Sequence, residues 1–265
     1  MISGIFHQGS GLGNQLFRYI ATRVLALDKG YDFSMIASEN FKGKDFMNLS
    51  MVNRLGVADL VHDIYSTQYP EGKIIPLGFD MKPTKVWEEN TNYFNPEFFF
   101  IEDNTIIDGE FQSEQYFGHR LKEIDEWLKI EPMSSPEDMC VIGFRGGEFY
   151  MFPELGLPKE YFDEGIRIMK EINPNMRFEV QTDDPKLARQ FFPDYPIVQD
   201  IAHNWRSVRS AKYAIIANSS FYILPRLLKH HENKDSLTLS PRYWARRNTK
   251  EWSRPDNFYR AFQYI

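Results

Sequence analysis

The chain has 265 residues, more than a typical single domain and close to the length of two. Apolar residues make up 42% and charged residues 26%, which excludes the composition of a disordered chain. The net charge of -6 repels nucleic acid and anionic membrane surfaces, so any anionic ligand must be held locally. The single cysteine, Cys140, excludes an intrachain disulfide and any multi-cysteine metal site.

Three features of the sequence bear on its location. No apolar run approaches the roughly 20 residues that span a bilayer, and the first residues lack the basic and apolar segments of a secretory signal. A single cysteine fits a reducing compartment. We therefore expect a cytoplasmic protein with no integral membrane segment and no nucleic acid partner.

The N-terminal part of the chain predicts a β-loop-α-β unit. The apolar run 2–6 predicts a buried strand, and the glycine-rich turn 9–13 follows it. Apolar residues recur at helical spacing from Asn14, and Gly30 is a plausible stop. A second strand is predicted at 32–36.

After residue 36, the next secondary-structure element that the sequence predicts begins only at residue 106. Residues 37–100 have weak periodicity and receive no assignment, whereas 106–111 predicts a strand. Ser113 is then expected to cap one helix. The apolar residues of its inner face are Phe117, Leu121, Ile124 and Leu128.

The polar, proline-containing stretch 131–138 is interpreted as a linker between an N-terminal lobe, 1–130, and a C-terminal lobe, 139–265. After it, strands and helices alternate, which favours an α/β fold with a doubly wound parallel sheet. The predicted strands are 139–144, 177–182 and 213–217, and the predicted helices are 159–172, 185–192, 205–211 and 221–231.

Polar residues follow three of these strands, at the edge where open parallel sheets bind ligands. In chain order they are Arg145, the pair Asp183 and Asp184, and the run Asn218-Ser219-Ser220. An arginine fork and a helix start suit a diphosphate, and a carboxylate suits a ribose or a guanine edge. Each also has a plain structural interpretation: a surface ion pair, a turn with a helix cap, and a simple cap.

Other binding motifs fit poorly. The turn 9–13 resembles a dinucleotide fingerprint, but its third glycine comes one residue early and no acidic residue ends the next strand, so NAD binding is a minor alternative. The sequence contains no Walker A, His-x-His, His-Glu-x-x-His or Asp-x-Asp pattern, and we expect a site without metal. The lack of Gly-x-Ser-x-Gly disfavours a serine hydrolase.

Six segments follow the order of motifs in a known family. They are Gly11–Tyr19, Gly109–Phe117, Arg145–Glu148, Leu157–Phe162, Thr182–Asp184 and Ile216–Phe221. In these segments the chain resembles the bacterial α-(1,2)-fucosyltransferases. The resemblance implies a GT-B fold, with two Rossmann-like lobes and a cleft between them. It also implies an inverting transfer of L-fucose from GDP-fucose to a sugar hydroxyl, O2 of a galactoside, with no metal and no cofactor besides the donor substrate.

The resemblance also assigns roles to residues. Arg145 falls on the family arginine that holds the diphosphate. The other residues on the donor side are Asp183, Asp184, Asn218, Ser219, Ser220 and Phe221. Gly13, Asn14 and Gln15 fall in the first-lobe segment that faces the cleft and the glycan acceptor. His7 is expected on the same side from its place after the first predicted strand, and residues 37–117 are expected to shape the acceptor site.

The chain departs from the family pattern in two places. The family motif His-x-Arg-Arg-Gly-Asp corresponds to 143–148, which reads Gly-Phe-Arg-Gly-Gly-Glu, so the second arginine is lost. The tryptophan pair that often follows the last motif is replaced by Tyr222-Ile223-Leu224-Pro225. Two alternatives therefore stay open: a transferase of the same fold that uses another nucleotide sugar, and a catalytically silent nucleotide- or sugar-binding module.

An inverting transfer needs a base for the acceptor hydroxyl. Glu148 is the first candidate because it lies three residues beyond Arg145, although a role as the partner that holds Arg145 fits equally well. His7, after the first strand, is the reserve candidate, and its plain alternative is a histidine that is simply hydrogen-bonded.

Overall fold

The computed structural model describes residues 1–50, 75–77, 82–89, 94–131, 133–152, 154–242 and 258–265. The chain divides into two compact units, Met1–Lys129 (unit 1) and Ile130–Ile265 (unit 2). Part of the region expected to shape the acceptor site, 51–74, and Pro132 of the expected linker lie outside the described residues. Within the part that is described, no helix combines the length and the apolar character needed to cross a membrane.

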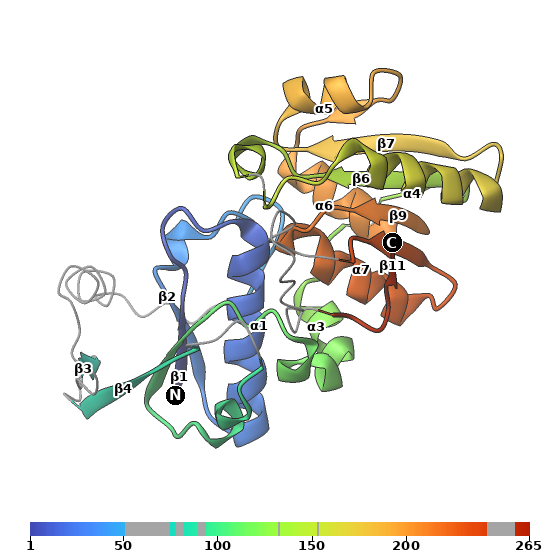
Figure 1. The fold of residues 1–265 in the computed structure, drawn as a ribbon. Helices are drawn as coiled ribbons and strands as arrows, with labels where there is room; N and C mark the ends of the chain where they lie inside the picture. Colours follow the sequence, from blue (N-terminus) through green and yellow to red (C-terminus); the bar gives the residue numbers. More distant parts are fainter. Residues whose placement is uncertain (51–74, 78–81, 90–93, 132, 153, 243–257) are drawn as a thin grey trace. The chain divides into compact units, whose positions relative to one another are not determined.

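Unit 1 is built on a five-stranded sheet in the order β2-β1-β5-β4-β3 (Figure 1). Neighbouring strands are parallel except for the antiparallel pair β3 and β4. The strands are β1 (Ile2–Ile5), β2 (Phe33–Ile36), β3 (Ile75–Leu77), β4 (Lys82–Glu88) and β5 (Thr105–Asp108). The helices are α1 (Leu12–Lys29), α3 (Leu121–Trp127) and the 3₁₀ turns η1 (Ser38–Asn40), η3 (Pro96–Phe100), η4 (Glu114–Tyr116) and η5 (Gly118–Arg120).

The predicted β-loop-α-β unit is confirmed. Helix α1 begins two residues before the predicted start and packs on β1, where a Cβ added at Gly4 would lie 2.2 Å from the hydroxyl of Thr22. The helix ends at Gly30, whose φ of 68° is left-handed and whose N–H bonds back to the helix carbonyls. The close packing of Thr22 on Gly4 brings the side chains of α1 near the carboxyl ends of β1 and β5.

The prediction of one continuous helix after Ser113 is wrong. The segment forms η4, η5 and only then α3. Ser113 does act as a cap, since its side chain accepts from the N–H of Gln115, but it caps η4. Phe117, which is fully buried and packs against Phe17 at 5.7 Å, has a φ of -143° and interrupts the helix. Tertiary packing therefore overrides the helical spacing.

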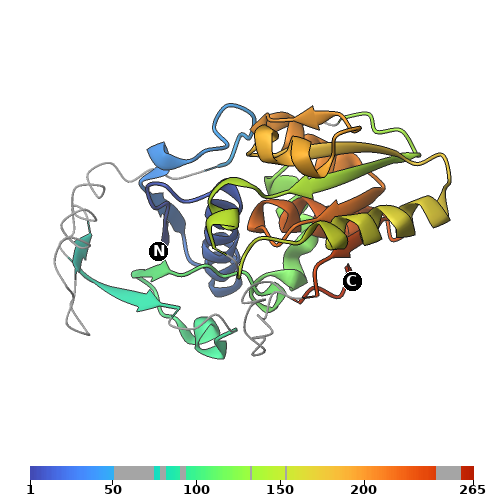
Figure 2. The same ribbon diagram turned by 45° about the horizontal axis from the view of Figure 1, so that its top comes forward.

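Unit 2 contains a six-stranded, fully parallel sheet in the order β11-β10-β9-β6-β7-β8. The strands are β6 (Met139–Phe144), β7 (Arg177–Thr182), β8 (Ile197–Val198), β9 (Tyr213–Ile216), β10 (Leu237–Ser240) and β11 (Gln263–Tyr264). The helices are α4 (Lys159–Ile172), α5 (Pro185–Phe191), α6 (Ile201–Ser210), α7 (Ser220–Glu232) and the 3₁₀ helix η6 (Gly147–Met151). Figure 2 shows α4 running along this sheet.

Helices cover both faces of the sheet in unit 2, which confirms the predicted α/β, doubly wound parallel sheet. Phe144 points to one face and packs against Phe162 of α4 and Phe191 of α5. Gly143, one residue earlier and therefore on the opposite face, lies against Tyr222 of α7. Helix α6 packs with α7 and begins four residues earlier than predicted.

A buried arginine ties α6 to β10. The Arg226 side chain is fully buried and donates to the carbonyls of Val208, Ala211 and Lys212 at the end of α6. It also donates to the hydroxyl of Thr238 at 2.8 Å. Burial lowers the pKa of Arg226 to about 9, so the guanidinium stays charged at neutral pH and favours the negative end of the helix dipole.

Candidate functional site

The strand order of unit 2 places a ligand edge between β6 and β9. The chain leaves β6 for β7 and β8 on one side and returns for β9 and β10 on the other, so the loops after β6 and β9 diverge. The register pairs Gly143 with Ile216, which brings both strands to the same edge. The amide of Asn218, after β9, donates to the carbonyl of Leu155, in the long connection after β6, at 3.0 Å.

Arg145 lies at this edge and contacts two carboxylates. One fork nitrogen, Nη1, bonds Asp183, which follows β7. The other, Nη2, donates to Glu148 at 2.9 Å, and the guanidinium lies 5.0 Å from the ring centre of Phe149. The structure therefore brings Arg145, Glu148 and Asp183 together as the sequence predicts, and it joins them to one another.

The two aspartates after β7 hold the turn that follows β6. Asp183 accepts from the N–H of Gly146 at 2.8 Å, and Asp184 accepts from the N–H of Gly147 at 3.3 Å. Asp184 also caps α5, since its other oxygen accepts from Leu187 at 3.0 Å. All four carboxylate oxygens of the pair thus accept a hydrogen bond from the chain itself. Their predicted contact with ribose or guanine stays a prediction.

The run after β9 leads directly into α7. Asn218 and Ser219 are more than nine-tenths buried, and Ser219 precedes the first helical residue, Ser220. The ring of Phe221 packs edge-on against Trp205 of α6 at 5.8 Å. The start of a 13-residue helix therefore lies at the same sheet edge as Arg145, with its backbone N–H groups at the edge.

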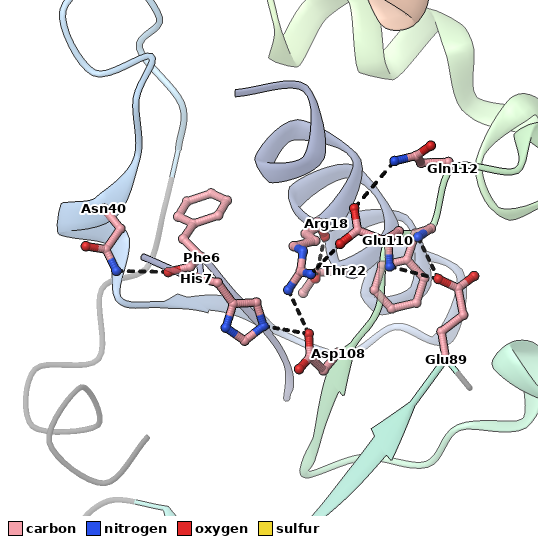
Figure 3. Close-up of polar contacts among 10 residues, drawn as sticks. Phe6, His7, Arg18, Thr22, Asn40, Glu89, Asp108, Glu110 and Gln112 are labelled. Carbon is pink, nitrogen blue, oxygen red and sulfur yellow. Dashed lines mark hydrogen bonds and ion pairs between the residues drawn. The ribbon is translucent and has the colours of Figure 1, made fainter. Parts of the chain in front are cut away.

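Unit 1 holds a second polar cluster, drawn in Figure 3. His7, two residues beyond β1, contacts Asp108, the last residue of β5, with Nε2 and Oδ1 2.8 Å apart. The same oxygen accepts from Nη1 of Arg18 at 2.7 Å, and Nη2 of Arg18 donates to Glu110 at 2.9 Å. Adjacent strands β1 and β5 and helix α1 thus supply one chain of charges, which we call the His7 network (His7, Asp108, Arg18 and Glu110).

The other predicted residues of unit 1 lie on the first turn of α1. Gly13 is buried, and Asn14 accepts a hydrogen bond from Gln112 at 3.2 Å. Gln15 is fully buried and holds the loop after β2, since it donates to the carbonyl of Asn40 and accepts from the N–H of Lys42. The geometry places Asn14 beside the His7 network through Gln112, which also contacts Glu110 at 3.4 Å. Gln15 instead has a structural role.

Glu89 supports the turn that carries Glu110. One of its oxygens accepts from the N–H groups of Glu110 and Phe111, both at 2.8 Å. The strand ends at Asp108 and not at Phe111 as predicted, and Phe111 lies in the following turn with a left-handed φ of 49°. Burial raises the pKa of Glu89, and the backbone hydrogen bonds oppose that rise.

Sequence reasoning missed Asp108, Arg18 and Glu110 as members of a site. Arg18 and Glu110 lie within the two motif segments 11–19 and 109–117, and this position was the one indication in the sequence that they belong to a site. Asp108 lies within the predicted strand 106–111, but nothing in its neighbourhood indicates that its partner is His7, 101 positions away. Only the pairing of β1 with β5 brings them together.

No protein-family model matches the sequence, and no curated protein matches it either. Several solved structures are similar in fold. A mutant of Arabidopsis thaliana FUT1 in complex with GDP has a TM-score of 0.52 at 10% identity, over 86% of this chain and 68% of that one. Escherichia coli heptosyltransferase WaaC with ADP has a TM-score of 0.47 at 10% identity, over 100% and 92%. NodZ α-1,6-fucosyltransferase soaked with GDP-fucose has a TM-score of 0.45 at 13% identity, over 85% and 92%.

The likeness to FUT1 concerns the fold. This chain is an α/β protein whose sheets are parallel except for the pair β3 and β4, and its fold is similar to that of a GT-B glycosyltransferase. That is the class of fold implied by the sequence resemblance. At 10% identity the likeness carries no residue roles, so the function is argued from the site.

Proposed function

We propose that the protein is an inverting glycosyltransferase that moves L-fucose from GDP-fucose to a hydroxyl of a sugar acceptor, O2 of a galactoside, without a metal ion. The observation that carries the proposal is the edge between β6 and β9, where Arg145 and the start of α7 follow adjacent strands. The likeness in fold to FUT1 in complex with GDP and the motif order support it.

Arg145 and α7 have complementary roles in this proposal. A guanidinium can hold two phosphate oxygens with charge-assisted hydrogen bonds that strengthen as the diphosphate leaves. The positive end of the α7 dipole favours the same anion. Glu148, with 66% of its side chain exposed, forms a surface ion pair that an incoming phosphate can replace at little cost.

Unit 1 supplies the groups that suit the acceptor. The His7 network, with Asn14 and Gln112 beside it, presents hydrogen-bond donors and acceptors at the carboxyl ends of β1 and β5. Sugar hydroxyls both donate and accept, so a mixed polar cluster of this kind can orient one of them. These residues include His7 and Asn14, which the sequence predicts on the acceptor side.

The lost second arginine defines the alternatives, because one phosphate-binding charge of the family pattern is missing at Gly146. A transferase with another nucleotide sugar and a silent binding module both keep the edge between β6 and β9. They differ from the proposal in which nucleotide binds and whether turnover occurs. A single set of measurements therefore separates all three.

The test begins with calorimetric titration of GDP, UDP, CMP and ADP into the whole protein. Turnover is then measured with GDP-fucose, GDP-mannose and a UDP-sugar, using lactose as acceptor, with and without EDTA. We expect GDP to bind most tightly and GDP-fucose to be used, with the rate unchanged by EDTA. Preferred use of another donor overturns the named substrate, binding without turnover supports the silent module, and rescue of the EDTA-treated protein by manganese or magnesium overturns metal independence.

A further inference from the structure

The position of the His7 network is that of a functional cluster and not of a core ion pair. In the sheet order β2-β1-β5, the chain leaves β1 for β2 on one side, while β5 lies on the other. His7 and Asp108 follow or end these two adjacent strands at their carboxyl ends. The edge where strand order reverses is where open parallel sheets bind their ligands.

Exposure increases from Arg18 through Asp108 to His7. The side chain of Arg18 is 8% exposed, that of Asp108 15% and that of His7 28%. Among these three residues the cation and the carboxylate are the inner pair and the imidazole is the most exposed, while Glu110, at the other end of the network, has 47% of its side chain exposed. Figure 3 shows the Arg18 guanidinium and the His7 ring meeting at the same carboxylate oxygen of Asp108.

This order fixes the chemistry of the ring. Arg18 stabilises the ionised form of Asp108, and an ionised carboxylate only accepts hydrogen bonds. The hydrogen of the neutral imidazole is then on Nε2, 2.8 Å from Asp108, and Nδ1 is the nitrogen that takes up a second proton. A histidine whose tautomer is set by a carboxylate is suited to general base catalysis.

We infer that His7 is the general base of the transfer proposed above, and that Asp108 and Arg18 are positioning residues that set its orientation and tautomer. The inference rests on the proposed function. In the step, the acceptor hydroxyl loses its proton to Nδ1 of His7, its oxygen forms the new bond to the anomeric carbon, and the bond from that carbon to the phosphate oxygen breaks. The diphosphate leaves with the electron pair, and the imidazolium later releases its proton to water.

The geometry favours His7 over Glu148, the first candidate from the sequence. Glu148 is an exposed carboxylate bound to the fork of Arg145, the group assigned to the departing diphosphate. A base beside the leaving group is on the wrong side for an inverting attack, which comes from the opposite face of the sugar. His7 belongs to the unit assigned to the acceptor.

The critical variant is His7→Gln. The glutamine amide can still donate to Asp108, so a merely structural histidine is replaced with little loss, whereas the titratable nitrogen is gone. We expect kcat to fall about 100-fold or more, while the KM for GDP-fucose and the affinity for GDP stay within about 2-fold of wild type. The wild-type profile of rate against pH should have an ascending limb that H7Q lacks.

Unit 1 contains a matched control. His119 contacts Asp28 at 2.8 Å, and Asp28 also binds Arg120 at 2.6 Å, so the trio repeats the chemistry of His7, Asp108 and Arg18. Asp28 is near the end of α1, away from the carboxyl edge where the helix begins. H119Q should therefore keep wild-type kcat and the ascending limb.

Each outcome decides the inference. A fall in kcat confined to H7Q, with loss of the ascending limb, supports it. An H7Q enzyme near wild-type rate, a slow H7Q enzyme that keeps the limb, or an equal loss in H119Q overturns the base assignment while leaving the transferase standing. A wild type inactive with every donor overturns the proposed function, and this inference with it.

The positioning role has its own readout. Asp108→Asn should lower kcat less than H7Q does, and nitrogen NMR of the ring should show that His7 no longer holds its neutral hydrogen mainly on Nε2. An unchanged tautomer in D108N, together with an unchanged rate, overturns the role of Asp108.

Discussion

The ring of Tyr222 lies so close to Gly143 that a Cβ added at residue 143 would be 2.8 Å from the ring carbons. The hydroxyl of Tyr222 donates to the carbonyls of Phe144 and Gln181, at the ends of β6 and β7. In the family that the sequence resembles, a histidine usually stands at the position of Gly143, and a tryptophan pair often stands in the segment that begins here with Tyr222. One contact therefore links two departures from the family pattern, and it explains why a larger residue is absent at 143.

Gly143→Ala should destabilise the protein, because both partners are buried and the backbone and ring cannot easily separate. We expect a loss of about 1–3 kcal/mol in the free energy of unfolding, measured by urea denaturation. Tyr222→Leu offers a smaller, more flexible side chain, so the cost of G143A should shrink in the Y222L background. Additive effects of the two changes would show that the contact is not the cause.

Unit 2 shows which parts of a fold a sequence predicts well. The bounds of β6, β7 and α4 agree with the prediction to the residue. Each has a strong signal, a buried apolar run or an amphipathic period, with polar residues at both ends. In contrast, β8 and β11 have two residues each, too few for any period, and they form because a neighbouring strand offers hydrogen bonds.

The candidate site was predictable in composition but less so in contacts. The alternation of strands and helices predicts a parallel sheet, so Arg145 and Asp183 were expected at the same edge. Their pairing was not, because a carboxylate near an arginine can serve either a ligand or the arginine itself. The His7 network needed tertiary information: Asp108 and His7 meet only because β5 pairs with β1, and most of the chain between β2 and β5 has weak periodicity.

Arg145→Lys should weaken GDP binding nearly as much as Arg145→Ala. The fork spans two separate carboxylates, with Nη1 on Asp183 and Nη2 on Glu148, and an ammonium has no such geometry. We expect at least about a 10-fold loss of GDP affinity by calorimetry in both variants. Thermal melting should confirm that both fold. Wild-type affinity in R145K would show that charge alone is required.

Glu148→Gln tests whether this carboxylate competes with the diphosphate for Arg145. If it does, removing its charge should raise GDP affinity by a few-fold, since the exposed ion pair is worth about 0–1 kcal/mol. Glu160, an exposed residue in the first turn of α4, provides the control E160Q, for which no change is expected. Loss of turnover in E148Q without a gain in GDP affinity would restore Glu148 as the candidate base.

Asp183→Asn separates two roles of the aspartate pair. If Asp183 holds Arg145 and the N–H of Gly146, the variant should lose affinity for GDP and UDP by the same factor. If it reads the guanine edge, GDP affinity should fall selectively. We expect the uniform loss, because the carboxylate is already occupied by the turn. Asp184→Asn introduces a residue that also caps helices well, so the stability of this variant protein should differ little from that of the wild type.

Glu89 should make stability depend on pH. Its pKa is raised in the folded chain by burial, so the folded state binds the proton more tightly than the unfolded state does. The free energy of unfolding contributed by Glu89 therefore falls as pH rises from its unfolded pKa, about 4.3, through its higher folded pKa. Glu89→Gln removes the titrating carboxyl and with it this pH dependence. The amide oxygen of the glutamine can still accept the hydrogen bonds from the N–H groups of Glu110 and Phe111.

The measurement is the free energy of unfolding of wild type and E89Q by urea at several values between pH 4 and pH 7. The difference should shift in favour of E89Q as pH rises, because the buried carboxylate must ionise only in the wild type. Glu88, the exposed neighbour at the end of β4, provides the control E88Q, which should follow the wild type. A difference between wild type and E89Q that does not change with pH would show that Glu89 titrates alike in both states. The turn carrying Glu110 would then owe nothing to its charge.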